Sequence, residues 1–206
     1  EGDKEHDLHI GILKEMLRNI DIPAVVGGRI KRLEDVKKYL YAGAGSVYLD
    51  AASEEQTALL KEASDRFGSG RVGVRLEDPG QMGAYASLGA GFFFLPAGRC
   101  PEEGTEKDCF LLSEQASCGE LASMLSAPGV DGAVLTEEET GFLELKDKLE
   151  AMGLPMNVFV PALSWEELKK NENGLVPAIV QDYRTDEVLM MAYMNEQAFQ
   201  DTMRTG

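Results

Sequence analysis

Positive charge, cysteine and long apolar runs are all scarce in this sequence. The chain has 20 Lys and Arg against 36 Asp and Glu, which gives a formal net charge of −16. Nucleic acid is therefore not an expected partner, because a phosphate backbone must be met by clustered cations. No apolar run approaches the roughly 20 residues that span a bilayer, and no basic leader precedes an apolar stretch. We therefore expect a cytoplasmic protein with no membrane partner.

Cysteine and histidine, the usual protein ligands of zinc, are also few. The three cysteines, Cys100, Cys109 and Cys118, are evenly spaced, and the two histidines, His6 and His9, lie far from them in the sequence. Structural zinc sites use closely spaced cysteine pairs supplemented by histidine. The spacing thus predicts no metal site and no cofactor within this chain, and the odd number of thiols fits a reducing cytosol.

Helical and extended patterns alternate over most of the chain. Apolar residues at helical spacing predict helices over residues 8–20, 33–41, 53–67, 118–125 and 138–152. Short apolar runs predict seven strands, at residues 23–26, 46–50, 71–76, 91–95, 109–112, 132–135 and 156–160. Strands joined by single helices imply parallel, right-handed crossovers. Seven strands at intervals of roughly 20–25 residues favour a (β/α) barrel over an open sheet.

Near its end the chain changes to a hairpin pattern. Residues 175–180 and 188–193 are β-prone apolar runs on either side of a polar turn. Asn195 can cap a helix over residues 196–203 by accepting a backbone N–H of the first turn. The last part of the chain is therefore expected to be a β-hairpin followed by a helix.

A short connecting element is expected before the hairpin. Ser164 and Glu167 form a capping box, which predicts a helix over residues 165–170, and residues 171–174 favour a turn. Trp165 is expected to anchor this helix by packing, and its alternative role is stacking on a ligand.

Residues 174–206, GLVPAIVQDYRTDEVLMMAYMNEQAFQDTMRTG, resemble the amino-terminal segment of phosphoribosyl-AMP cyclohydrolase. This histidine-biosynthesis enzyme opens the purine ring of its substrate by hydrolysis. The resemblance implies a phosphoribosylated substrate, a metal-activated water and a homodimer formed through this domain. The family's metal-binding cysteines and its Trp-His-Lys-Gly-Glu-Thr-Ser-Gly-type segment do not follow in this sequence. We therefore expect an internal fragment that is inactive alone, with zinc and magnesium bound by the absent parts; the alternative is an unrelated hairpin and helix.

A second resemblance covers residues 22–38, 41–45 and 47–53. They are similar to the third and fourth βα units of two sister barrels of histidine biosynthesis, the phosphoribosylformimino-AICAR ribotide isomerase and the cyclase of imidazole glycerol phosphate synthase. The resemblance is specific over about 50 residues and fades beyond Asp78. It implies that the first strands of the barrel are missing from this chain.

The barrel resemblance also suggests candidate site residues. Gly27 and Gly28 match a Gly-Gly turn that holds one phosphate of a substrate with two phosphates, because glycines let backbone N–H groups approach an anion closely; the alternative is a tight turn. Asp50 departs from the family pattern, since a carboxylate there would repel that phosphate. Glu77 stands where the family has one acid of its catalytic acid/base pair, and the alternative is a solvated acid at the barrel rim.

Together, the two resemblances suggest a bifunctional phosphoribosyl-AMP cyclohydrolase/phosphoribosyl-ATP pyrophosphohydrolase with an amino-terminal barrel. The expected fold class is α/β, an incomplete (β/α)8-type barrel followed by the opening hairpin and helix of an α+β cyclohydrolase domain. The expected domains are residues 1–161 for the barrel, 162–173 for the linker and 174–206 for the cyclohydrolase start. The barrel is expected to be a non-catalytic platform. The alternatives are a phosphosugar-binding regulatory barrel and an isomerase-like barrel.

Overall fold

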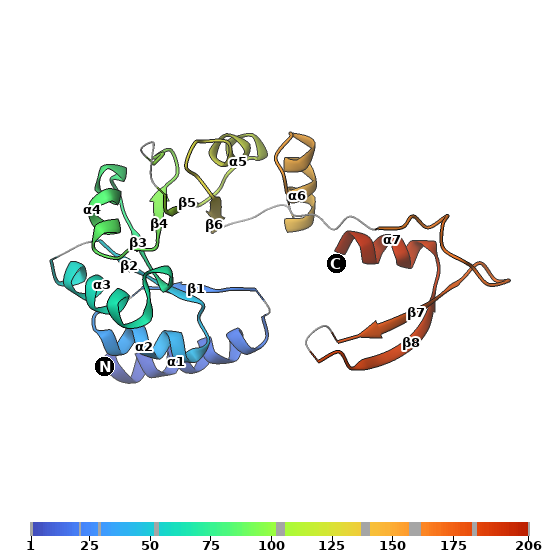
Figure 1. The fold of residues 1–206 in the computed structure, drawn as a ribbon, viewed down its shortest axis with the longest axis horizontal. Coiled ribbons are helices and arrows are strands. Elements are labelled where there is room, and N and C mark those ends of the chain that lie inside the picture. The colour runs from blue at the N-terminus through green and yellow to red at the C-terminus, as the bar shows by residue number, and fades with distance from the viewer. Residues whose placement is uncertain are drawn as a thin grey trace. The chain divides into compact units, whose positions relative to one another are not determined.

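The chain forms two compact units, residues 1–138 and 139–206. A six-stranded sheet lies in the first unit and a two-stranded sheet in the second (Figure 1). The computed structural model describes residues 2–20, 22–28, 30–51, 54–101, 106–136, 141–156, 162–182 and 185–205. Within these ranges, every helix is too short or too polar to traverse a bilayer.

The first unit is a parallel β-sheet with helices on one side. Its strands are β1 (Val25–Gly27), β2 (Ser46–Asp50), β3 (Val72–Arg75), β4 (Phe92–Pro96), β5 (Asp108–Ser113) and β6 (Gly132–Leu135). Its helices are α1 (Gly2–Arg18), α2 (Leu33–Ala42), α3 (Glu54–Phe67), α4 (Met82–Ser87) and α5 (Cys118–Leu125), with short 3-10 turns η1 (Ser69–Arg71) and η2 (Pro79–Gln81). Each strand pairs in parallel with the next strand in the chain. The sheet curls into a half-barrel, which confirms the predicted fold class (Figure 1).

The core of this unit lies between the sheet and its helices. Alternate strand residues point toward the helices and are almost fully buried, as expected for the covered face of a parallel sheet. These residues are Val47, Leu49, Val72, Val74, Leu76, Phe93, Leu95, Cys109 and Leu111. From α2 and α3, the same cluster contains Val36, Leu40, Leu60 and Ala63. The opposite face of the sheet is the concave one, and none of the described helices of this unit covers it (Figure 1).

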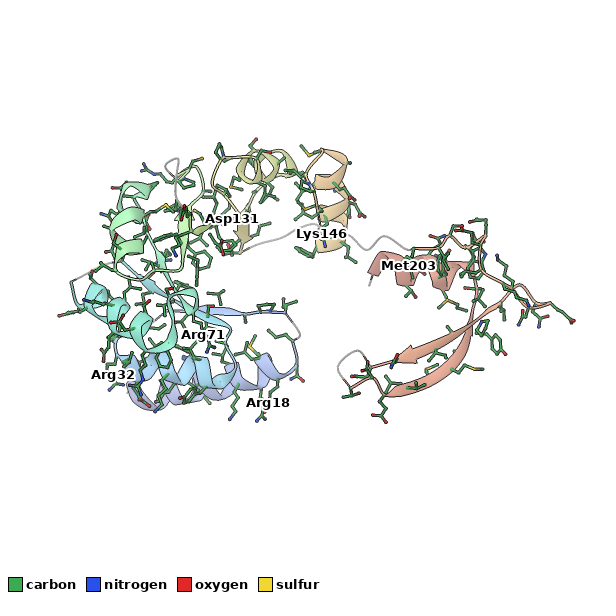
Figure 2. The ribbon with its side chains drawn as sticks, in the orientation of Figure 1. Arg18, Arg32, Arg71, Asp131, Lys146 and Met203 are labelled. Carbon is green, nitrogen blue, oxygen red and sulfur yellow. The ribbon has the colours of Figure 1, made fainter. Side chains whose placement is uncertain are left out.

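Two polar side chains tie the amino ends of neighbouring strands together (Figure 2). Arg71, just before β3, donates from Nε to the carbonyl oxygen of Gly45 and from Nη2 to that of Ala44, both at 3.0 Å. Asp131, just before β6, accepts a hydrogen bond of 2.8 Å from the backbone N–H of Cys109. The amino edge of the sheet is thereby held by its own side chains, whereas the candidate site residues lie toward the carboxyl edge.

The second unit contains a helix, a hairpin and a closing helix. Its elements are α6 (Phe142–Ala151), the antiparallel strands β7 (Val176–Gln181) and β8 (Val188–Met194), and α7 (Glu196–Thr205). Asn195 accepts a hydrogen bond of 2.8 Å from the N–H of Ala198, which is the predicted helix cap. The predicted hairpin and the helix after it are therefore confirmed.

Trp165 is a packing anchor in this second unit. Its side chain is buried, and its ring centroid lies 5.6 Å from that of Phe199 in α7. The ammonium group of Lys170 lies 5.0 Å from the centre of the Trp165 ring, a cation–π geometry. These contacts account for a tryptophan at this position without a stacking role toward a ligand.

The predicted helix over residues 165–170 is wrong, because a turn follows Ser164 instead. Lys170 Nζ donates to the carbonyl oxygens of Trp165 and Leu168, at 2.6 and 3.1 Å. In a continuing helix, those carbonyls would accept backbone N–H groups of the following turn. Here the lysine side chain donates to both carbonyls, and the Trp165 carbonyl also accepts the N–H of Leu168 at 3.3 Å.

Helix α4 was not predicted from the sequence. It has six residues, fewer than two turns, which is too short to show a helical period. It follows a 3-10 turn in which the Asp78 carboxylate accepts the N–H of Gly80 at 3.1 Å. The strand predicted at residues 156–160 and the helix start predicted at Ser53 fall largely outside the described residues. The helix predicted over residues 138–152 is described from Phe142 to Ala151.

Candidate functional site

Aromatic side chains cover the concave face of the half-barrel. Tyr48 of β2, Phe92 and Phe94 of β4 and Phe110 of β5 point away from the helices. The ring centroids of Tyr48 and Phe94 are 5.2 Å apart at an interplanar angle of 73°, and those of Phe94 and Phe110 are 5.7 Å apart at 41°. Phe92 meets both other phenylalanines edge to face, at 5.7 and 6.5 Å. Such steeply angled rings form a connected aromatic layer with favourable geometry.

Each of three glycines lies beside an aromatic ring in this layer. Gly27 is the register partner of Tyr48, and a Cβ on Gly27 would overlap the ring of that tyrosine. A Cβ on Gly73 would likewise overlap the ring of Phe92. A Cβ on Gly132 would crowd the ring of Phe110, which is the register partner of Gly132. The absence of a side chain at these positions therefore makes room for the rings. For Gly27, this packing role exists in the protein without any ligand.

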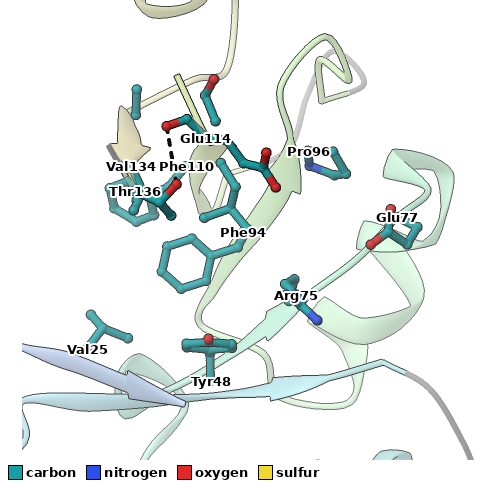
Figure 3. A pocket seen from close by; sticks show the side chains of 13 residues that line it. Val25, Tyr48, Arg75, Glu77, Phe94, Pro96, Phe110, Glu114, Val134 and Thr136 are labelled. Carbon is teal, nitrogen blue, oxygen red and sulfur yellow. Dashed lines mark hydrogen bonds between the residues drawn. The ribbon is translucent and has the colours of Figure 1, made fainter. Parts of the chain in front are cut away.

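A pocket of about 770 Å³ opens above the aromatic layer (Figure 3). Its apolar lining includes Val25, Tyr48, Phe94, Phe110 and Leu112. Its polar lining consists of Arg75, Glu77, Ser113, Glu114 and Thr136, which lie in or just after the last residues of β3, β5 and β6. The pocket therefore combines an aromatic floor with a polar rim at the carboxyl edge of the sheet, the edge at which barrel and open α/β enzymes place their sites.

One ion pair joins the rim to the neighbouring strand. Arg75 and Asp50 are register partners across the β2–β3 pair, and Arg75 Nε lies 2.6 Å from Asp50 Oδ1. Both side chains are partly exposed, at 45% and 41%. The carboxylate of Asp50, which was expected to repel a phosphate, thus has its charge matched by the arginine. Arg75 is the single cation among the described residues that line the pocket, and this ion pair already engages it.

Glu77 and Glu114 bring two carboxylates to the pocket rim. Glu77 follows β3, Glu114 follows β5, and β4 lies between them. Since adjacent strands are about 4.8 Å apart, the two backbones are separated by about 10 Å. Both glutamates are exposed. The hydroxyl of Thr136 donates to the carbonyl oxygen of Glu114 at 3.2 Å (Figure 3), which ties the end of β6 to the rim.

Gly28 and the start of α2 form the candidate phosphate turn. Gly28 has φ 91°, a conformation that favours glycine, and no atom lies within 4 Å of where its Cβ would be. Its carbonyl oxygen accepts a hydrogen bond of 3.4 Å from the hydroxyl of Tyr39. The carboxylate of Asp35 accepts the backbone N–H groups of Lys31 and Arg32, at 3.1 and 3.0 Å. Two of the donors that a phosphate could use are therefore already bonded within the protein.

The cysteines do not form a metal site in the part of the chain that the structure describes. Cys100 is exposed, Cys118 is half-buried, and Cys109 is buried in β5. Burial, with a smaller contribution from Asp131, raises the pKa of the Cys109 thiol to about 11. Across the described ranges, no three His, Cys, Asp or Glu side chains group closely enough to hold a metal ion. These residues do not fit the zinc and magnesium expected of a cyclohydrolase.

Sequence reasoning named Gly27, Gly28 and Glu77 but missed the aromatic layer and Glu114. The structure brings Glu77 into the pocket, and it places Gly27, the last residue of β1, against Tyr48 and outside the described pocket lining. One signal was present in the sequence. In β2, β4 and β5, aromatic residues stand at alternate positions between buried apolar ones, and a neighbouring strand has a glycine beside three of the rings.

Comparison with known proteins finds similarity to proteins of histidine biosynthesis. Residues 2–87 match the family of histidine biosynthesis proteins. The chain is 32% identical over 149 residues to the imidazole glycerol phosphate synthase subunit HisF of Halalkalibacterium halodurans, covering 71% of this chain and 55% of that protein. The barrel resemblance therefore extends well past Asp78, where it was expected to fade.

Shorter and stronger similarities involve cyclohydrolases. The chain is 63% identical over 41 residues to the phosphoribosyl-AMP cyclohydrolase of Pelotomaculum thermopropionicum, which is 20% of this chain and 32% of that protein. It is 60% identical over 40 residues to the histidine biosynthesis bifunctional protein HisIE of Aquifex aeolicus, which is 19% of this chain and 20% of that protein. The chain thus spans about half or less of the curated relatives that it matches. Its first part is similar to histidine biosynthesis proteins of the barrel type, and a further short segment is similar to the cyclohydrolases of histidine biosynthesis.

Proposed function

We propose that this chain belongs to a histidine-biosynthesis hydrolase of the phosphoribosyl-AMP cyclohydrolase type. The similarity to cyclohydrolases and bifunctional relatives exceeds 50% identity over 41 to 52 residues, and the strands β7 and β8 pair as a hairpin that α7 follows. Some of these relatives are bifunctional proteins, which supports a pyrophosphohydrolase activity as a second part of the proposal. The substrate would be phosphoribosyl-AMP.

The half-barrel, in this proposal, is a platform without catalytic activity of its own. The observation that carries this point is the charge of its pocket. Arg75 is the one cation among the described lining residues, and it is already paired with Asp50, while Glu77 and Glu114 add negative charge at the rim. A substrate with two phosphates would be repelled by these carboxylates. The acid/base chemistry of an isomerase would therefore lack a bound substrate.

A metal-activated water is the chemistry that such a hydrolase would supply. The described residues of this chain do not fit as its ligands, because no three His, Cys, Asp or Glu side chains among them lie close enough together to hold a metal ion. The proposal therefore assigns no catalytic step to these residues. We expect residues 1–206 alone to show no hydrolysis of phosphoribosyl-AMP.

Genetic complementation tests this proposal. The full reading frame that contains residues 1–206, rather than these residues alone, is expressed in three histidine auxotrophs. One lacks the cyclohydrolase, one the isomerase and one the cyclase subunit. We expect growth without histidine only in the first strain, and loss of that growth when residues 174–206 are deleted. A Glu77→Gln variant should grow as well as the unaltered protein. Growth of the isomerase or cyclase auxotroph would overturn the platform role.

A regulatory barrel that binds a phosphosugar is the second candidate function. Gly28 favours it, because its backbone has a positive φ and open space where a side chain would stand, so an anion could approach closely. Titration with ribose 5-phosphate by calorimetry checks this candidate. Binding that is lost in Gly28→Val but kept in Glu62→Gln, a change on the exposed side of α3, would support it. No heat at millimolar ribose 5-phosphate would end it.

A further inference from the structure

The pocket of the half-barrel has a ligand chemistry that the proposed function does not use. Its charges and its surface both differ from those of a phosphate site. Arg75 has its charge matched by Asp50 at 2.6 Å. Glu77 and Glu114 have no cationic partner among the described lining residues. Among the described lining residues, the rim therefore presents two carboxylates without a cationic partner, above an apolar floor.

The aromatic floor of the pocket would also attract a cation, as the rim carboxylates do. Tyr48 and Phe94 are nearly perpendicular, at 73°, and Phe110 is tilted by 41° to Phe94, with centroids between 5.2 and 5.7 Å apart. All three rings line the pocket. The faces of aromatic rings carry negative electrostatic potential and attract organic cations, most strongly where several rings surround one site. Rings and carboxylates thus favour the same kind of ligand.

We propose that this pocket binds a small organic cation with a flat apolar body, such as an aromatic amidine or amine. The flat body would lie against Phe94 and Phe110, and the cationic group would lie at the rim between Glu77 and Glu114. Figure 3 shows these two glutamates on either side of Pro96. The pocket volume of about 770 Å³ lies within the range typical of small-molecule sites.

This inference does not depend on the proposed hydrolase function. A cation site in the half-barrel would exist whether or not the chain belongs to a cyclohydrolase. It also makes the opposite prediction to a phosphosugar site, because the same rim charges that attract a cation repel an anion. The two candidates therefore separate in a single set of titrations.

The test uses three probes of one shape and different charge. Benzamidine is cationic, benzamide is neutral and benzoate is anionic, and each is titrated into the chain by calorimetry and by ligand-observed NMR. We expect benzamidine to bind about tenfold more tightly than benzamide, a difference of about 1.4 kcal/mol, and benzoate not to bind. Benzamidine binding should weaken as salt is added, because the rim is exposed to solvent.

Variants assign the binding to the pocket. Glu77→Gln and Glu114→Gln keep the shape of each side chain and should each weaken benzamidine about threefold, since exposed ion pairs contribute modestly. Phe94→Leu should weaken benzamidine and benzamide alike. Glu62→Gln is the matched control on α3 and should change neither. Circular dichroism confirms that each variant is folded.

Three outcomes would overturn the proposal. Equal affinity for the three probes would show that charge plays no part in binding. Benzamidine binding that survives in the Glu77→Gln/Glu114→Gln double variant would place the site elsewhere. No binding with benzamidine at about 10 mM, a concentration well above the dissociation constant of a specific site, would mean that the pocket takes no such ligand.

Discussion

Gly27 and Tyr48 are register partners on neighbouring strands, and a Cβ on Gly27 would overlap the Tyr48 ring. Gly27 was expected to serve a phosphate, yet the structure provides a reason for glycine that involves no ligand. The two explanations differ in what they predict for the protein alone. A packing role changes stability, whereas a binding role changes affinity only.

We expect Gly27→Ala to destabilise the chain by about 1 to 3 kcal/mol, the usual cost of overpacking. The added methyl group must displace the Tyr48 ring from its contact with Phe94. Urea unfolding in the absence of ligands measures this change. The Gly27→Ala/Tyr48→Ala double variant should lose less stability than the sum of the single variants. Strict additivity would show that the ring contact is not the cause.

Substitutions of Gly28 should change the stability of the protein through backbone conformation rather than through crowding. Its φ of 91° is costly for a residue with a Cβ, but the space around it is open. We expect Gly28→Ala to destabilise by about 1 kcal/mol and Gly28→Asn by less, because asparagine tolerates positive φ better than alanine. Thermal unfolding compares the two variants. A Gly28→Ala protein as stable as the unaltered chain would contradict this explanation.

The ion pair between Asp50 and Arg75 should make a modest, salt-dependent contribution to stability. Both side chains are partly exposed, and exposed pairs typically contribute about 0.2 to 1 kcal/mol. A double-mutant cycle with Asp50→Asn and Arg75→Gln measures the coupling free energy at low and high salt. The coupling should fall as salt rises. A coupling that exceeds this range and does not change with salt would indicate a buried pair.

Cys109 should make the first unit less stable at high pH. Its pKa is raised to about 11 from an ordinary value of 9.0, so the folded protein keeps the thiol proton to a higher pH than the unfolded chain does. Between pH 9 and pH 11 the unfolded chain loses this proton first, and stability falls by up to about 2 kcal/mol. Urea midpoints across this range should decline less steeply in Cys109→Ala. Equal slopes in both proteins would contradict the assignment.

Thiol labelling provides a separate check on the same residue. At pH 8 in the folded protein, iodoacetamide should modify Cys100, which is exposed, and leave Cys109 unmodified, because the thiolate is the reactive form. Mass spectrometry of the digested chain identifies the labelled sites. Modification of Cys109 at the rate of Cys100 would show that β5 opens readily.

Trp165, the chain's one tryptophan, should report on the second unit alone. It contacts Phe199 at 5.6 Å between ring centroids, and such pairs contribute about 0.5 to 1.5 kcal/mol beyond burial. Phe199→Leu should shift tryptophan emission to longer wavelength and lower the unfolding midpoint seen by fluorescence. The urea midpoint of the first unit, followed by iodoacetamide labelling of Cys109, should not move. Coincident shifts would mean that the two units unfold together.

The sequence was sufficient to predict the central strands of the first unit, β2 to β5, because one face of each is buried and apolar. Val47, Leu49, Val72 and Val74 produce that signal. The concave face could not be predicted in the same way, since its aromatic residues and glycines become meaningful only when the register places Gly27 beside Tyr48. The turn at Trp165 was missed because it depends on Lys170, whose side chain competes with the helix through hydrogen bonds that no periodicity reveals.

The order of the six strands follows the order of the chain, and this has a consequence for how the first unit assembles. Register partners on adjacent strands lie between 16 residues apart, for Phe92 and Asp108, and 25 residues apart, for Val47 and Val72. Each pairing therefore closes only a short loop, for which the entropy cost is small. As the chain leaves the ribosome, each new strand of this sheet can pair with the strand that precedes it in the sequence. The sheet can therefore grow one strand at a time from its amino end.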